Sequence, residues 1–190
     1  MMPVSLLFPF LYWQWFASEV IIALATRTRG SKGNVRDRGS MLLLWIVIAG
    51  GITASNWIAA RFPEPLFGAA RWLGSASVIV LLVGIATRWT AIITLGKAFS
   101  ANVAIRQAQE LKQTGLYRFV RHPSYSGLLL VLLAIGLHSH SWLGLLVLLV
   151  PATAALIYRI HIEEAALYKA FGVRYAEYSK VTSRLVPGLY

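Results

Sequence analysis

Arg121-His122-Pro123-Ser124-Tyr125 opens a segment in which no Asp, Glu, Lys or Arg occurs from His122 to Tyr158. A second polar group, Arg159-Ile160-His161-Ile162-Glu163-Glu164, closes that segment. An uncharged segment of this length fits a helical hairpin in a bilayer, because each helical residue advances the chain by about 1.5 Å. The two polar groups would then meet at one face of the membrane. A membrane enzyme needs this arrangement to bring a water-soluble cofactor to a lipid-embedded substrate.

The composition indicates a membrane protein. Of the 190 residues, 57% are hydrophobic and 13% charged, and the mean hydropathy is +0.64. A soluble domain of this size could not bury so much apolar surface. The net charge of +11 is concentrated beside hydrophobic segments, which favours membrane topology over nucleic-acid binding. The absence of cysteine excludes disulfides and thiolate metal ligands.

The hydrophobic pattern predicts an all-α, polytopic integral membrane protein with five transmembrane helices. The first three are expected at Val4 to Ala25, Met41 to Ala60 and Ala69 to Leu95. Helices four and five share Ser124 to Tyr158 and turn at His138-Ser139-His140-Ser141. Residues Leu167 to Val181 have amphipathic spacing and predict a further helix on the inner membrane interface, with a break at Gly172.

The basic residues predict the orientation. Sixteen of the 18 Lys and Arg lie beyond the first, third and fifth predicted spans or, for Arg88, near the end of the third. Because cytoplasmic loops are enriched in Lys and Arg, the N-terminus is expected outside and the C-terminus in the cytoplasm. The expected location is the cell membrane, the inner membrane if the source is bacterial, with the active site facing the cytoplasm.

Residues at the start of the fourth span have the chemistry of a binding site. Pro123 suits the first turn of a helix, and His122 then lies at its N-cap. A helix N-terminus in a partly dry setting attracts anions, and Tyr117 and Tyr125 can offer aromatic walls to a nucleobase. The alternative is purely structural: Arg118 and Arg121 extend to lipid headgroups and His122 caps the helix.

Arg159 and Glu163 lie four residues apart on one helical face. Arg before Glu is the poorer order for a stabilising pair, so ligand binding explains the arrangement better than helix stability does. The alternative is a solvated acidic pair beside an arginine at the membrane surface. Glu19 is the only carboxylate inside a predicted span, and a structural ion pair is its favoured interpretation. His138 and His140 have no neighbouring carboxylate, so no metal site is predicted.

The C-terminal half resembles the isoprenylcysteine carboxyl methyltransferase family of membrane enzymes. The resemblance rests on Gly115-Leu116-Tyr117, on Arg121-His122-Pro123-Ser124-Tyr125-x-Gly127, and on Arg159-x-x-x-Glu163-Glu164-x-x-Leu167-x-x-x-Phe171-Gly172-x-x-Tyr175-x-x-Tyr178, followed by Arg184-x-x-Pro187. These motifs agree in order and spacing from Phe99 to Pro187. The resemblance implies a single membrane-embedded domain, 1–190, with three spans in 1–95 and the cofactor-binding and catalytic half in 96–190.

The resemblance also implies S-adenosylmethionine as the cofactor, bound between cytoplasmic helix ends. The chain has no Gly-x-Gly-x-x-Gly fingerprint of a dinucleotide-binding fold. Arg159 and Glu163 would be catalytic, and Arg159 would contact the methyl acceptor. The residues expected to bind the cofactor are Gln109, Glu110, Leu111, Lys112, Tyr117, His122, Pro123, Ser124, Tyr125 and Glu163.

The implied reaction is O-methylation of a carboxylate on a lipidic, isoprenylcysteine-like acceptor. An anionic carboxylate needs no general base, whereas an amine must first lose a proton. Three alternatives remain at this point: a phospholipid N-methyltransferase, an NADPH-dependent sterol-type reductase, and a non-enzymatic transporter or scaffold. The expected partners are the lipid or prenylated acceptor and membrane lipids, with no nucleic acid. The sequence does not indicate the oligomeric state.

Overall fold

The computed structural model describes residues 4–25, 39–62, 72–96 and 110–190, and these ranges are helical apart from short connections. Among the described residues the only β-pairing is one isolated bridge between Val120 and Ser183. The all-α prediction is therefore confirmed for them. The helices are α1 (Val4–Ala25), α2 (Ser40–Arg61), α3 (Trp72–Leu95), the short 3-10 helix η3 (Gly115–Arg118), α4 (Pro123–His138), α5 (Trp142–Phe171) and α6 (Val173–Val181).

Four of the described helices, α1, α2, α3 and α5, are long and apolar enough to cross a bilayer. The predicted hairpin is present and turns where expected, between His138 and Trp142. Its two arms are unequal, because α4 has 16 residues and α5 has 30. The uncharged part of α5 ends at Tyr158, as the sequence shows, but the helix itself continues to Phe171. Arg159, the first charged residue of α5, is buried within the protein.

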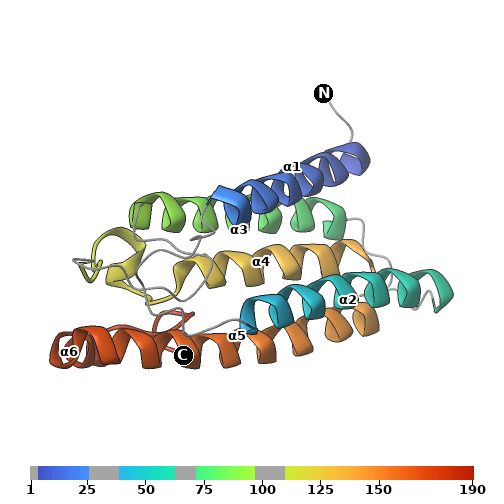
Figure 1. Ribbon diagram of the computed structural model, residues 1–190. Helices are drawn as coiled ribbons and strands as arrows, with labels where there is room; N and C mark the ends of the chain where they lie inside the picture. The colour runs from blue at the N-terminus through green and yellow to red at the C-terminus, as the bar shows by residue number, and fades with distance from the viewer. Residues whose placement is uncertain (1–3, 26–38, 63–71, 97–109) are drawn as a thin grey trace.

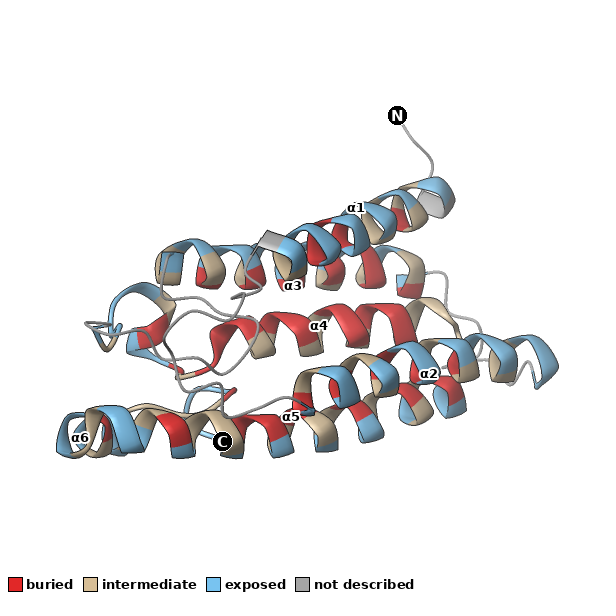
Figure 2. Cartoon of the chain, viewed as in Figure 1, coloured by how far each residue is buried: buried red, intermediate tan, exposed pale blue. Residues whose placement is uncertain are grey.

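Helix α4 lies at the centre of the bundle. It packs between α3 and α5, while α1 lies against α3 and α2 against α5 (Figure 1). Every residue of α4 is buried or half-buried, as the mostly red and tan ribbon in Figure 2 shows. The surrounding helices instead expose large apolar side chains, among them Trp13, Ile46, Ile93 and Val150. An outer surface of this kind is suited to contact with lipid.

Two glycines bring α3 and α4 into backbone contact. A Cβ atom added at Gly127 would lie 2.6 Å from the backbone nitrogen of Arg88, and one added at Gly84 would lie 2.8 Å from that of Val131. No side chain fits at these separations. Small residues permit such close helix approach in membrane proteins. The crossing therefore fixes the height of Arg88 relative to the start of α4.

Gly172 ends α5 with a φ of +53°, in the left-handed region that glycine adopts readily. The predicted break at this residue is confirmed. The predicted start of the amphipathic helix at Leu167 is wrong, because Leu167 to Phe171 continue α5 and only Val173–Val181 form the separate helix α6.

The chain after α6 returns to the start of α4. The backbone N–H of Arg121 donates to the carbonyl of Ser183 at 2.8 Å, and that of His122 donates to Arg184 at 3.0 Å. The Ser126 hydroxyl donates to the Leu185 carbonyl at 2.6 Å. The C-terminal segment therefore holds the loop that precedes α4.

Candidate functional site

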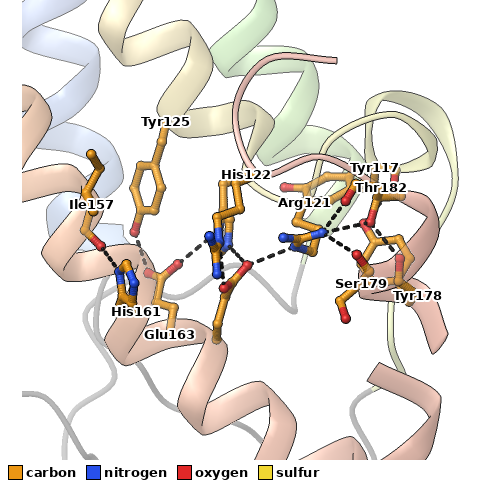
Figure 3. Close-up of polar contacts among 12 residues, drawn as sticks. Tyr117, Arg121, His122, Tyr125, Ile157, His161, Glu163, Tyr178, Ser179 and Thr182 are labelled. Atoms are coloured by element: carbon orange, nitrogen blue, oxygen red, sulfur yellow. Dashed lines mark hydrogen bonds and ion pairs between the residues drawn. The ribbon is translucent and has the colours of Figure 1, made fainter. Parts of the chain in front are cut away.

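The start of α4 is built as its sequence predicts. Pro123 is the first helical residue, and its missing N–H costs nothing there. His122 occupies the N-cap position, but no side chain caps the helix. The structural alternative for this residue, a capping histidine, is therefore wrong. The imidazole makes no hydrogen bond to the N-terminal N–H groups of α4 and instead lies against α5 (Figure 3).

Arg159 and Glu163, one turn apart on α5, face the start of α4. The Tyr125 hydroxyl donates to Oε1 of Glu163 and accepts from Nε of Arg159 at 2.7 Å. Nη2 of Arg159 lies 3.2 Å from the same carboxylate oxygen, and Nη1 donates to the Ser40 hydroxyl of α2 at 2.9 Å. Arg159 is only 1% exposed, so its side chain does not extend to solvent or to lipid headgroups. Three helices thus contribute to one polar cluster.

His122 lies between two carboxylates. Its Nδ1 is 3.4 Å from Oε2 of Glu163 (Figure 3). Its Nε2 is 3.5 Å from Oε1 of Glu164. Burial alone would lower the pKa of His122, but the two neighbouring carboxylates outweigh it and raise the pKa above its usual value. Among the described residues Nε2, which is buried, has this 3.5 Å contact with Glu164 but no hydrogen bond of normal geometry. The imidazole therefore favours the charged form, with both ring nitrogens facing carboxylates.

Glu164 connects the same cluster to the C-terminal segment. Its Oε1 accepts from Nε of Arg121 at 2.8 Å and its Oε2 from Nε of Arg184 at 2.9 Å. Arg121 also donates to the carbonyls of Ser179, at 2.8 Å, and Thr182. Arg121 is thus an internal cross-link, and the interpretation that it extends to lipid headgroups is wrong.

The structure brings together four of the residues singled out from the sequence: His122, Tyr125, Arg159 and Glu163. Pro123 and Ser124 adjoin them in the first turn of α4. Whether any of these residues binds a ligand stays a prediction. The shared geometry explains why residues far apart in the chain can serve one site.

Other predicted cofactor residues lie apart from this cluster or outside the description. The Tyr117 hydroxyl donates to the Ala91 carbonyl of α3 at 3.3 Å, so its hydrogen bond is to α3 and not to the cluster. Glu110 and Lys112 are exposed and Leu111 is half-buried. Gln109 lies outside the described residues. Their assignment to a cofactor stays a prediction.

Two members of the cluster were missed as site residues by sequence reasoning. Ser40 opens α2 and carries no motif, so nothing in the sequence connects it to Arg159, 119 residues away. Glu164 did have a signal, since it adjoins Glu163 in a matched motif, but its partners lie on distant segments. Glu19, for which an ion pair was favoured, does pair with Arg88 of α3.

Comparisons with known proteins agree with the sequence motifs. The model of the isoprenylcysteine carboxyl methyltransferase family matches residues 77–169. The chain is 30% identical over 118 residues to protein-S-isoprenylcysteine O-methyltransferase B of Arabidopsis thaliana, covering 61% of this chain and 60% of the relative. It is 29% identical over 149 residues to the Schizosaccharomyces pombe protein-S-isoprenylcysteine O-methyltransferase, covering 76% and 63%. The chain thus spans about three fifths of the length of these relatives.

A solved structure shares the fold. It is the structure of the eukaryotic intramembrane Ras methyltransferase, isoprenylcysteine carboxyl methyltransferase, without a monobody. The TM-score is 0.65 at 24% sequence identity, covering 82% of this chain and 55% of that one. The family match over residues 77–169, the plant and yeast relatives and the shared fold agree with one another: the chain is similar to the isoprenylcysteine carboxyl methyltransferase family.

Proposed function

We propose that this chain is a membrane methyltransferase that uses S-adenosylmethionine to methylate the carboxylate of an isoprenylcysteine-like acceptor. The single observation that carries the proposal is the polar cluster of His122, Tyr125, Arg159 and Glu163 in an otherwise apolar bundle. Buried polar groups on membrane helices are costly, and ligand binding is a common reason for them. The names of the plant and yeast relatives favour this reaction class.

The residues present are suited to the cofactor. Among the described residues, the buried Nε2 of His122 makes only a 3.5 Å contact with Glu164 and no regular hydrogen bond, and the uncapped start of α4 suits a carboxylate. Glu163 can accept hydrogen bonds from hydroxyl groups in addition to its present contacts. We assign cofactor binding to these two residues and to Pro123, Ser124 and Tyr125, with Tyr117 and residues 109–112 as the predicted outer part. When bound, S-adenosylmethionine supplies a methyl group activated by its sulfonium.

Arg159 is assigned to the acceptor carboxylate. Its guanidinium can bind a carboxylate through two parallel hydrogen bonds. The acceptor would replace one of its present partners, of which the Ser40 hydroxyl is the weakest acceptor because it is uncharged. No base is needed, since the acceptor is already anionic. The raised pKa of His122 makes the imidazole a poor base at neutral pH, which favours a carboxylate over an amine acceptor.

We further propose five membrane crossings, with the N-terminus outside and the site facing the cytoplasm. Helix α4 is about 24 Å long at about 1.5 Å per residue, short of the hydrocarbon thickness of about 30 Å. It is surrounded by other helices, so it can complete the fifth crossing without a full lipid-facing length. Helices α1, α3 and α5 run in one direction and α2 and α4 in the other, so α1, α3 and α5 end on the side of the bundle where α4 begins (Figure 1). Helix α6 would then lie at the inner interface.

The alternatives are not favoured. A phospholipid N-methyltransferase would need a neutral base, and a reductase would need to recognise NADPH. The relatives are named as O-methyltransferases of isoprenylcysteine, and none of those matched here is named as a reductase or transporter.

The test is methyl transfer by the full chain purified in detergent. Radiolabelled S-adenosylmethionine is supplied with an amine-blocked S-farnesylcysteine, and the lipid product is treated with mild base. A methyl ester releases volatile methanol, whereas an N-methyl group is stable. We expect base-labile product that requires the free carboxylate, with none from the carboxamide analogue. Base-stable methylation of phosphatidylethanolamine, or no transfer at all, would overturn the proposal.

A further inference from the structure

A buried ion pair lies outside the polar cluster and has no part in the proposed chemistry. Glu19 of α1 is 3% exposed and Arg88 of α3 is 4% exposed. Nε of Arg88 donates to Oε1 of Glu19, and Nη2 donates to Oε2 at 2.6 Å, so the contact is bidentate. Such a pair stabilises a fold only when its remaining donors are also satisfied. The remaining nitrogen of the Arg88 guanidinium, Nη1, therefore also needs a hydrogen-bond acceptor.

The contact of Nη1 leads to the site. Nη1 of Arg88 donates to the carbonyl of Ser124 at 3.0 Å. This carbonyl belongs to the peptide group that joins Ser124 to Tyr125, in the first turn of α4. The Tyr125 hydroxyl then bonds both Glu163 and Arg159. The guanidinium thus holds the peptide from which the central phenol of the cluster extends.

The helix crossing makes this contact possible. Gly127 lets the backbone of Arg88 touch α4, and Glu19 fixes the plane of the guanidinium from the opposite side. A lysine at this position could pair with Glu19, but it lacks the planar fork needed to reach both carboxylate oxygens and the carbonyl. Binding both Glu19 oxygens and the Ser124 carbonyl at once therefore requires arginine, whereas a simple ion pair between two helices does not.

We infer that Glu19 and Arg88 are positioning residues, which set the first turn of α4 and Tyr125 for cofactor binding. The inference rests on the proposed use of S-adenosylmethionine at that turn. It assigns a role to α1, the first helix of the chain, in a site otherwise built from α2, α4 and α5. Neither residue contacts the proposed reacting groups.

The test compares Arg88→Lys, Glu19→Asp and Glu19→Gln with Ser77→Ala in detergent-purified full chain. Ser77 is a matched control, since it is a buried polar residue of α3 whose hydroxyl bonds the Gly74 carbonyl and lies 3.4 Å from Nδ1 of His138, at the opposite end of α4 from the first turn. We expect the dissociation constant for S-adenosylmethionine to rise about fivefold or more in Arg88→Lys, as loss of one hydrogen bond at the site implies. The dissociation constant of Glu19→Asp, which keeps the charge, should lie between those of wild type and Glu19→Gln.

A second readout separates positioning from general stability. Hydrogen exchange of the peptide containing Ser124 to Leu128 should accelerate in Arg88→Lys but not in Ser77→Ala. If folded Arg88→Lys and Glu19→Asp bind the cofactor like Ser77→Ala and exchange at the wild-type rate, the pair is only a structural clamp and the inference fails. Failure of wild type to bind S-adenosylmethionine would instead overturn the proposed function.

Discussion

Glutamine at position 163 would neutralise the central carboxylate of the site with almost no change in shape. Glu163 faces Nη2 of Arg159 at 3.2 Å, Nδ1 of His122 at 3.4 Å and the Tyr125 hydroxyl. The amide keeps one acceptor oxygen but loses the charge that these groups share. A hydrogen bond to a charged group contributes about 1.5–3 kcal/mol, and about 1.4 kcal/mol corresponds to a tenfold change in affinity. Glu163→Gln should therefore weaken S-adenosylmethionine binding roughly 10- to 100-fold.

The assay is isothermal titration of S-adenosylmethionine into the detergent-purified variant, with the melting temperature measured in parallel. Glu177→Gln is the matched control, because it makes the same chemical change at an exposed residue of α6. The control should bind as wild type does. An affinity for Glu163→Gln within about twofold of the control, in a folded protein, would refute the assignment of Glu163 to the cofactor.

Three further predictions concern the acceptor, the imidazole and the helix crossing. Arg159→Lys should raise the KM for the acceptor about tenfold or more and change the affinity for the cofactor little, because lysine cannot form the bidentate pair with a carboxylate. Methyl-transfer kinetics measure this KM, and an unchanged value would show that Arg159 does not bind the acceptor. Because the pKa of His122 is raised in the folded state, its stabilisation is complete below about pH 6.5 and is lost as the pH rises through the folded pKa. Melting temperatures should therefore fall from pH 6 to pH 9 more steeply in wild type than in His122→Gln, and parallel profiles would contradict this. Gly84→Ala should destabilise the fold by about 1–3 kcal/mol in denaturant titrations, since the added Cβ would overlap the backbone of α4. Gly50→Ala is the control and should not destabilise the fold, because the space around its Cβ is open. Equal stabilities of the two variants would argue against the close crossing of α3 and α4.

Local features of the fold were predictable because each has a local cause. The hydrophobic runs indicate the long helices, Pro123 marks the start of α4, and Gly172 marks the break after α5. These signals act within a few residues of the structure they specify. The i, i+4 spacing of Arg159 and Glu163 likewise places them on one face without knowledge of the rest of the chain.

Partners across the bundle were not predictable in the same way. The sequence alone suggested that Arg159 could extend to the membrane surface, because an arginine beside an apolar segment commonly does so. Its charge is instead accommodated by Ser40, Tyr125 and Glu163, which come from three helices. The pairing of Glu19 with Arg88 has the same origin, since a single sequence shows that a buried charge needs a partner but not which helix provides it.

The most direct test of the central claim is a calorimetric titration of the wild-type chain in detergent with S-adenosylmethionine and, separately, with NADPH. The polar cluster at the start of α4, as a methyltransferase site, predicts saturable heat with S-adenosylmethionine and none with NADPH, and the heat should be lost in Glu163→Gln. Saturable heat with NADPH alone, or S-adenosylmethionine binding that Glu163→Gln leaves intact, would contradict the account.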